Sequence, residues 1–122
     1  MPKKSRMALP QELEVWYILP AIRKEFAARM IDRGMKQKDI AEKLGLTEAA
    51  ISQYVKNKRA SEIKFDVKIK NEINRAVGRV IKGSSILEEI QKICHMVKQE
   101  KVLCEVHKKY GKPPKNCKVC LC

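Results

Sequence analysis

The fold is decided by the stretch from Gln37 to Arg59, which reads QKDIAEKLGLTEAAISQYVKNKR. It contains the pattern Gln-x3-Ala-x3-Gly-x5-Ile, formed by Gln37, Ala41, Gly45 and Ile51. In a helix over residues 37–44, the small side chain of Ala41 lets a second helix cross closely. Gly45 suits the left-handed position that ends this helix. A second helix, over residues 48–56, is predicted to begin after Thr47 as its cap. Two short helices joined by a tight turn are the layout of a helix-turn-helix.

The second helix separates its apolar residues from its small and hydrogen-bonding residues. Ile51 and Tyr54, three positions apart, are predicted to face the core. The outward residues are of types that reach base edges in the major groove of DNA, and we expect Thr47, Ser52 and Gln53 to contact bases. Gln37 and the basic residues near the end of the stretch are expected to contact phosphates. The predicted DNA-binding set is Gln37, Thr47, Glu48, Ala49, Ser52, Gln53, Lys56, Lys58 and Arg59.

These residues resemble the motif of the Xre/Cro superfamily of DNA-binding regulators. The similarity runs from LPQELE through ILPAIRKEFA to YVKNKRA, and over this first half the chain is similar to archaeal regulators of that class. Lys36 departs from the pattern, because such motifs usually place a Ser or Thr cap before the glutamine. The resemblance implies an all-α, Xre/Cro-like DNA-binding domain of about five helices that regulates transcription.

The charge balance agrees with a nucleic-acid partner. The 122 residues include 27 Lys and Arg but only 14 Asp and Glu, a formal net charge of +13 that is spread over both halves. Such an excess predicts a polyanionic partner, and we expect double-stranded DNA. The longest apolar run, residues 15–22, is short and interrupted by Pro20, so neither a membrane span nor a secretory signal is predicted. We expect a cytoplasmic protein without a membrane partner or a small-molecule substrate.

Two helices are predicted before the motif, at residues 11–18 and 20–33. Pro10 and Pro20 suit the first position of a helix, where the missing N–H is no loss. In the longer helix, apolar residues at every fourth position form a stripe that should pack under the helix-turn-helix. These residues are Ile22, Phe26 and Met30.

After the motif, Asp66 is predicted to cap a helix that ends near Gly83, and Ser85 with Glu88 forms a capping box for another. The apolar residues of that last helix have a heptad spacing, which fits a two-fold dimer seam or packing against the preceding helix equally well. They are Ile86, Ile90, Ile93 and Val97. Because one helix-turn-helix reads few base pairs, we expect a homodimer. The predicted division is a DNA-binding domain over residues 1–83 and a helix with a cysteine-rich tail over residues 84–122.

All five cysteines follow residue 93, in the pattern C-x9-C-x12-C-x2-C-x-C. In a reducing cytoplasm such a group more often binds a metal than forms structural disulfides. The set Cys94, Cys104, Cys117 and Cys120 would suit an iron–sulfur cluster, with four irons and four sulfides expected. The alternates are Cys122 and His107, and the set Cys104, His107, Cys117 and Cys120 would instead make a tetrahedral zinc site.

Helix geometry separates the two ligand sets. On one unbroken helix Cys94 and Cys104 would lie about 15 Å apart, so the cluster requires a break near residues 98–101. The number of cysteines and the resemblance favour the cluster, and hence a redox- or oxygen-responsive regulator. Structural zinc, or a disulfide switch between Cys117 and Cys120, remains the alternative. A thiol oxidoreductase is disfavoured because no strands are predicted around that pair, so we do not expect an enzyme.

Overall fold

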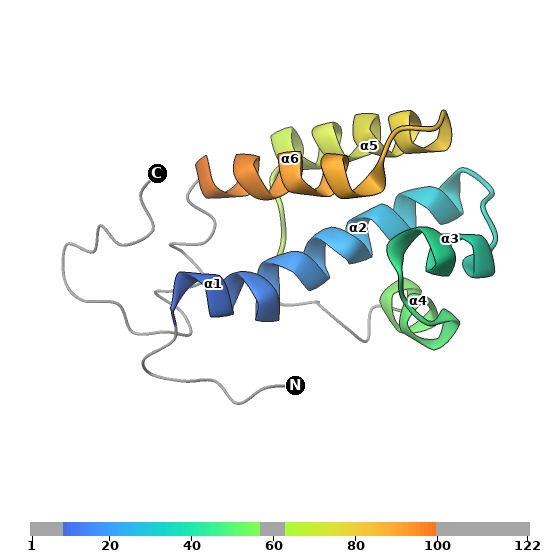
Figure 1. Ribbon diagram of the computed structural model, residues 1–122, viewed down its shortest axis with the longest axis horizontal. Helices are drawn as coiled ribbons and strands as arrows, with labels where there is room; N and C mark the ends of the chain where they lie inside the picture. The colour runs from blue at the N-terminus through green and yellow to red at the C-terminus, as the bar shows by residue number, and fades with distance from the viewer. Residues whose placement is uncertain (1–8, 57–62, 100–122) are drawn as a thin grey trace.

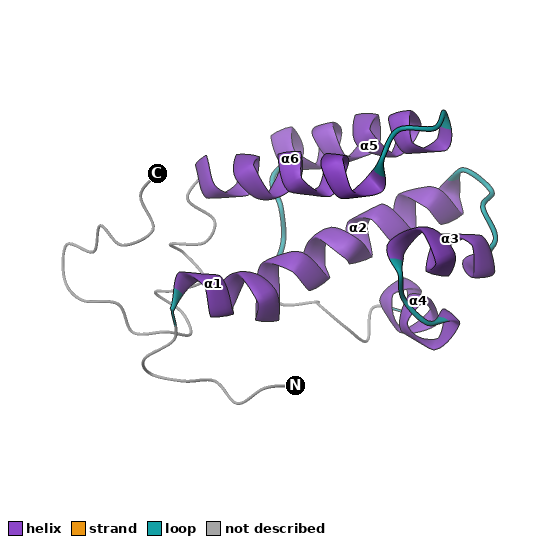
Figure 2. Cartoon of the chain, viewed as in Figure 1, coloured by secondary structure: helices purple, strands orange, loops and turns teal. Residues whose placement is uncertain are grey.

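The computed structural model describes residues 9–56 and 63–99. The elements in these ranges are α1 (Pro10–Leu13), a π-helical turn η1 (Glu14–Ile18), α2 (Leu19–Asp32), α3 (Gln37–Leu44), α4 (Glu48–Val55), α5 (Val67–Ile81) and α6 (Ile86–Gln99). Because α1, η1 and α2 are continuous, they count as one of five helical segments. The described ranges contain no strand (Figure 2), which confirms the predicted all-α class.

The first helical segment corrects the prediction of two separate helices, at residues 11–18 and 20–33. The chain does not break before Pro20; it passes through a π turn in which the Leu19 N–H donates to the Glu14 carbonyl. A proline ring crowds the carbonyl four residues earlier, and a π turn widens the helix at this point. The widening lets the helix continue through the proline to Asp32.

α2 lies in the middle of the domain, with α3 and α4 on one side and α5 and α6 on the other (Figure 1). The predicted stripe on α2 is buried, since Ile22, Phe26 and Met30 are all 0% exposed. Side chains from all four flanking helices join this stripe in a single hydrophobic cluster. They include Ile40, Ile51, Ile73 and Ile93. The two helix pairs therefore share one core that is centred on α2.

The helices α5 and α6 start at the predicted caps, and a short turn that contains Gly83 joins them. The Ile69 N–H donates to Asp66 Oδ1 at 3.0 Å, and Gly83 has a φ of 117°. Ser85 Oγ accepts from the Glu88 N–H at 3.4 Å, which is the Ser85 half of the predicted capping box. The starts of α5 and α6 are thus set by short-range hydrogen bonds, and the turn between them contains one glycine in the left-handed region.

The heptad stripe of α6 faces its own domain. Ile93 and Val97 are each 1% exposed and belong to the core, while Ile86 and Ile90 are partly buried against it. The stripe therefore packs within its own chain, which corrects the prediction that it forms a dimer seam. The physical reason is that α6 covers apolar surface of α5 and α2 that would otherwise be exposed. The core also continues past Gly83, so α6 packs with the residues before it.

Candidate nucleic-acid interface

α3 begins and ends as the sequence predicts. Lys36 precedes it without a side-chain cap, and Gly45 follows it with a φ of 66°. No heavy atom lies within 4 Å of a Cβ placed on Gly45, so its backbone conformation, and not crowding, is what favours glycine there. The Leu46 N–H donates to the Ala41 carbonyl at 2.9 Å, which closes a Schellman motif. This tight ending sets the direction in which α4 departs.

α4 is fixed by its cap and by one apolar side. Thr47 Oγ1 accepts from the Ala50 N–H at 3.1 Å, which confirms the predicted cap. Ile51 is 0% and Tyr54 4% exposed, so both face the core as predicted. The opposite side of the helix is consequently turned to solvent. Of the predicted contact residues on it, Thr47, Glu48, Ala49, Gln53 and Lys56 are exposed and Ser52 is partly exposed.

Most of the predicted DNA-binding residues are exposed to solvent on the helix-turn-helix. Gln37 is exposed at the first position of α3, and the outward residues of α4 follow it after one tight turn. Lys58 and Arg59 lie outside the described residues. Apart from Glu48 and Lys56, the described side chains of this set are uncharged, and most of them can form hydrogen bonds, which suits contacts with base edges more than simple attraction to phosphate.

A contact that the sequence analysis did not predict holds the end of α2 against α5. Arg33 Nη2 donates to the backbone carbonyl of Asn74 at 3.0 Å and to its Oδ1 at 3.1 Å. A Cβ on Gly78 would lie 3.1 Å from Arg33 Nη1, so glycine leaves room for the guanidinium. Since α3 starts four residues after Arg33, this contact restrains the turn that positions the helix-turn-helix. No local pattern signals it, because Arg33 and Asn74 are 41 residues apart.

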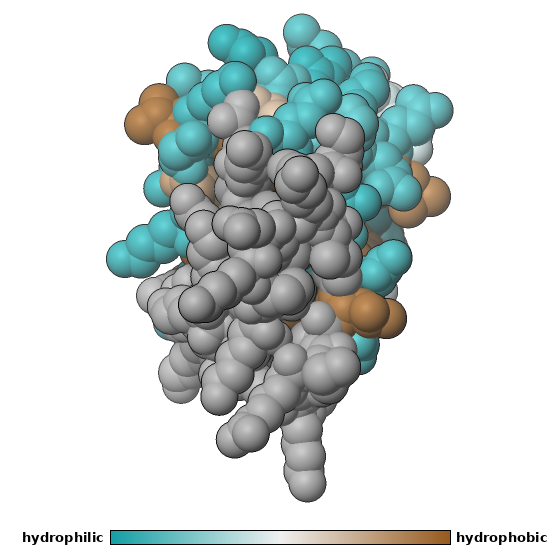
Figure 3. Space-filling model, turned by 90° about the vertical axis from the view of Figure 1, so that its left-hand side faces the viewer, coloured by the Kyte–Doolittle hydropathy of each residue, from teal (hydrophilic) through white to brown (hydrophobic). Residues whose placement is uncertain are grey.

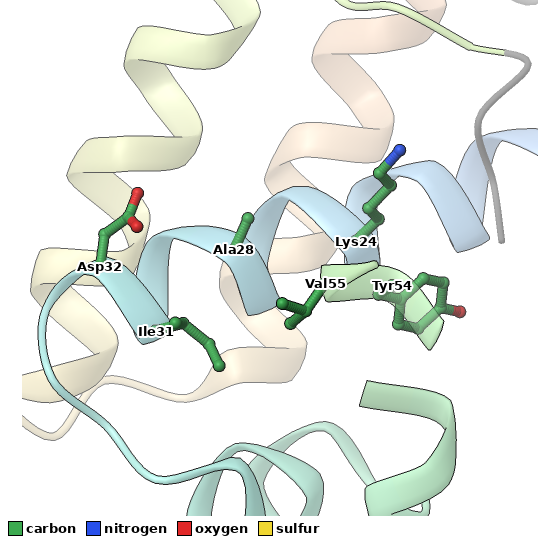
Figure 4. A pocket seen from close by; sticks show the side chains of 6 residues that line it. All are labelled: Lys24, Ala28, Ile31, Asp32, Tyr54 and Val55. Carbon is green, nitrogen blue, oxygen red and sulfur yellow. The ribbon is translucent and has the colours of Figure 1, made fainter. Parts of the chain in front are cut away.

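A shallow pocket of about 360 Å³ lies between α2 and the end of α4 (Figure 4). Its lining is largely aliphatic, with one lysine and one aspartate. It is formed by Lys24, Ala28, Ile31, Asp32, Tyr54 and Val55.

Cys94 is the one predicted metal ligand that falls within the described residues. It is 5% exposed in the core of α6, and burial, together with the nearby charge of Glu14, raises the pKa of its thiol to about 11. A metal binds the thiolate, which this environment disfavours. α6 also runs without a break through Gln99, where the described part of the helix ends.

The other predicted ligands, Cys104, His107, Cys117, Cys120 and Cys122, lie outside the described residues. Within residues 9–56 and 63–99, no three His, Cys, Asp or Glu side chains are grouped so that they could hold a metal ion. None of the helices in the same ranges is both long and apolar enough to span a membrane.

Comparison with protein families gives a match that includes α3 and α4. A helix-turn-helix family model (HTH_3) matches residues 26–65, one third of the chain, from the middle of α2 to the residue before the Asp66 cap. Neither the curated proteins nor the solved structures gave a match. The chain therefore contains an Xre/Cro-type helix-turn-helix domain, which indicates a DNA-binding regulator and is typical of regulators that are not enzymes.

Proposed function

We propose that the protein is a sequence-specific transcriptional regulator that places α4 in the major groove of double-stranded DNA. The observation that carries the proposal is the division of α4 between a buried apolar side and an exposed polar side, within a matched helix-turn-helix domain. Recognition helices of this class contact base edges with residues near their N-terminus. Thr47 and Glu48 occupy that position here.

Residue roles follow from the chemistry of each exposed side chain. Gln53 can form a bidentate pair with adenine, while Thr47 and Ser52 can donate to or accept from several base edges. Gln37, Lys56, Lys58 and Arg59 are proposed to contact phosphates, which fixes register without reading sequence. Glu48 can accept from a cytosine amino group, and Ala49 can contact a thymine methyl group.

Replacement of Gln53 tests the recognition surface. Gln53→Ala should cost about 1–3 kcal/mol of binding free energy on the selected site and relax the base preference at one position. Gln91→Ala, at another exposed glutamine, on α6, is the matched control and should change neither quantity. Both would be measured by binding-site selection followed by titration at fixed salt. Unchanged affinity and preference in Gln53→Ala would show that α4 does not read bases.

We also propose that the protein binds as a homodimer. One helix-turn-helix reads few base pairs, and two copies on half-sites about 34 Å apart would supply the missing specificity. Leu87, at 75% exposure, is a large apolar residue of α6 that stays on the surface, in contrast to the buried stripe. Sedimentation of the protein with DNA that carries one or two half-sites would measure the stoichiometry. One chain bound per two-site duplex at saturation would contradict the dimer.

The cysteine tail is proposed to bind a metal, and the placement of Cys94 bears on which one. An iron–sulfur cluster on Cys94, Cys104, Cys117 and Cys120 would require Cys94, which is 5% exposed, to leave the core. A zinc site on Cys104, His107, Cys117 and Cys120 does not require this change. We therefore place structural zinc ahead of the redox-responsive cluster. A disulfide switch between Cys117 and Cys120 is the third candidate, and Cys122 an alternate ligand.

Two substitutions separate these candidates because they act in opposite directions. If zinc is bound, His107→Ala should lose the metal and Cys94→Ser should keep it at one ion per chain. If a cluster is bound, Cys94→Ser should lose a brown chromophore and His107→Ala should keep it. Metal analysis and absorption spectra of anaerobically purified protein measure both outcomes. A metal-free protein whose Cys117 and Cys120 oxidise reversibly would leave only the disulfide switch.

A further inference from the structure

We propose that the outer face of α5 binds the phosphate backbone of a second DNA duplex, separate from the one contacted by α4. Four exposed polar residues, Lys68, Asn71, Arg75 and Lys82, follow one another at intervals of three, four and seven positions. These intervals place them on one side of a helix, which we call the α5 basic face. The inference goes beyond the proposed function but rests on it, because α4 must first bring the protein to DNA.

The charge of the described chain is concentrated around α5. Residues 64–82 contain six basic and two acidic side chains, a formal charge of +4. Residues 36–56, which include both helices of the helix-turn-helix, contain four basic and three acidic side chains, a charge of only +1. Non-specific attraction to DNA comes from neutralised phosphates. Among these segments, the stronger site for such attraction is therefore α5.

Ion pairs with acidic residues do not cancel this excess. Glu89 of α6 pairs with Arg79, and Glu72 of α5 pairs with Arg79 and Arg75. Arg75, one of the cations of the α5 basic face, is thus paired with a carboxylate of its own helix. With α6 included, residues 64–99 still have eight basic and four acidic side chains, again +4. Lys68 and Lys82 lie on the side of α5 that is exposed to solvent.

Because α4 and α5 lie on opposite sides of α2 (Figure 1), we infer that a duplex bound to α5 is a different one from the duplex bound to α4. α2 packs against both α4 and α5, which lie on opposite sides of it (Figure 1). A duplex bound to the outward side of α4 is therefore separated from α5 by the body of the domain. From Lys68 to Lys82 the face is about 21 Å long, and a parallel duplex presents on the order of twelve phosphates over that length.

The apolar side of α5 distinguishes a nucleic acid from a membrane as the occupant. A helix that lies on a membrane inserts its apolar side into the lipid. In α5 most of that side is already used, since Ile69, Ile73 and Val77 are 0% exposed, and only Val67 and Ile81, at the two ends of the helix, are exposed apolar residues. Hydrophilic residues dominate the upper part of the surface in Figure 3, the level at which α5 and α6 lie in Figure 1. A charged surface on a helix whose continuous apolar side is packed in the core fits a phosphate backbone.

Co-capture of two duplexes tests the proposal. Duplex A carries the selected binding site and a fluorophore; duplex B has an unrelated sequence, equal length and a bead attachment. The full-length protein at low salt should retain A on beads that carry B. Lys68→Gln/Lys82→Gln should lower this retention by at least about tenfold, because two phosphate contacts are lost. Its affinity for A alone should stay within about threefold of wild type.

The matched control removes the same charge from exposed positions elsewhere. Lys43→Gln/Lys92→Gln, on α3 and α6, should retain most of the co-capture. Equal retention in wild type and Lys68→Gln/Lys82→Gln would overturn the inference, as would equal losses in both double variants. The inference would also be overturned if Lys68→Gln/Lys82→Gln weakened binding only to RNA or to phosphatidylglycerol vesicles and left the retention of duplex A unchanged. Failure of wild type to bind A would instead overturn the proposed function, so the two failures are distinguishable.

Discussion

The two helix pairs that flank α2 are stabilised in different ways. α3 and α4 have eight residues each and pack on α2 through apolar side chains such as Ile40 and Ile51. α5 and α6 have 15 and 14 residues and add a charged contact, in which Arg79 bonds both carboxylate oxygens of buried Glu89 at 2.9 Å. Isolated helices shorter than about 12–15 residues are marginal in water. The α3–α4 pair therefore depends on α2 for its stability, while the α5–α6 pair has a further contact of its own.

The largest expected effect comes from breaking the core that both pairs share. Phe26 is 0% exposed in the middle of α2, and Phe26→Ala should cost about 3–5 kcal/mol of unfolding free energy. Because one hydrophobic cluster joins both pairs, they should unfold together. Urea denaturation followed by far-UV circular dichroism and by fluorescence of Trp16 should give coincident transitions. Val67→Ala, at an exposed position, should change stability by less than about 0.5 kcal/mol. Separate transitions would show that the pairs are independent.

A smaller effect is expected at the charged contact that only the α5–α6 pair has. Glu89→Gln should cost about 1.5–3 kcal/mol at neutral pH, since a buried hydrogen bond between charged groups is weakened. The exposed neighbouring glutamate provides the control, and Glu88→Gln should leave stability nearly unchanged. Thermal or urea unfolding at pH 7 measures both. A loss as large in Glu88→Gln as in Glu89→Gln would remove the special role of the buried carboxylate.

The same contact predicts a pH dependence. Hydrogen bonds from Arg79 hold the pKa of Glu89 below its ordinary value of 4.5, and the pKa of Glu72 is lowered in the same way. A carboxylate with a depressed pKa stabilises the fold above the unfolded pKa and loses this effect as the pH falls through the folded pKa. Wild type should therefore lose stability below about pH 4.5. The difference between wild type and Glu89→Gln should shrink over the same range, and a constant difference would contradict the assignment.

The smallest effects concern the helix caps, and they sharpen the contrast between the pairs. Thr47→Ala and Asp66→Ala each remove a side chain that accepts a backbone N–H, at 3.1 and 3.0 Å. Each should cost about 1 kcal/mol of stability. Only Thr47→Ala should also alter the selected DNA sequence, because Thr47 lies on the exposed side of the helix-turn-helix. Altered base preference in Asp66→Ala at matched stability would mean that the α5 end of the domain contributes to sequence reading.

The features that were predicted correctly depend on neighbours in the chain. Thr47 and Asp66 each cap a helix through an N–H three residues ahead. Gly45 is in the left-handed region because the chain must turn there, whatever surrounds it. Such interactions are complete within one turn of helix, so residue type and spacing predict them. The π turn before Pro20 was missed because two proline-led helices and one widened helix have the same sequence signals.

The features that were missed or left open depend on distant parts of the chain. The stripe of Ile86, Ile90, Ile93 and Val97 has a spacing that fits a partner chain or its own domain, and the position of α2 and α5 decided for the domain. Arg33 and Asn74 meet only because α2 and α5 pack together. Cys94 shared a cysteine pattern with the tail, but its place on the inner side of α6 makes it a core residue.

The sequence by itself determined that the described chain is helical, where most helices begin and end, and that α3 and α4 form a helix-turn-helix. Periodicity, caps and glycines suffice for this, because they act within a few residues. Only the tertiary structure decided which helix faces are covered and which remain free. Burial depends on what packs against a face, so it placed the heptad stripe of α6 in the core and left the cations of α5 exposed on the side of α2 away from α4.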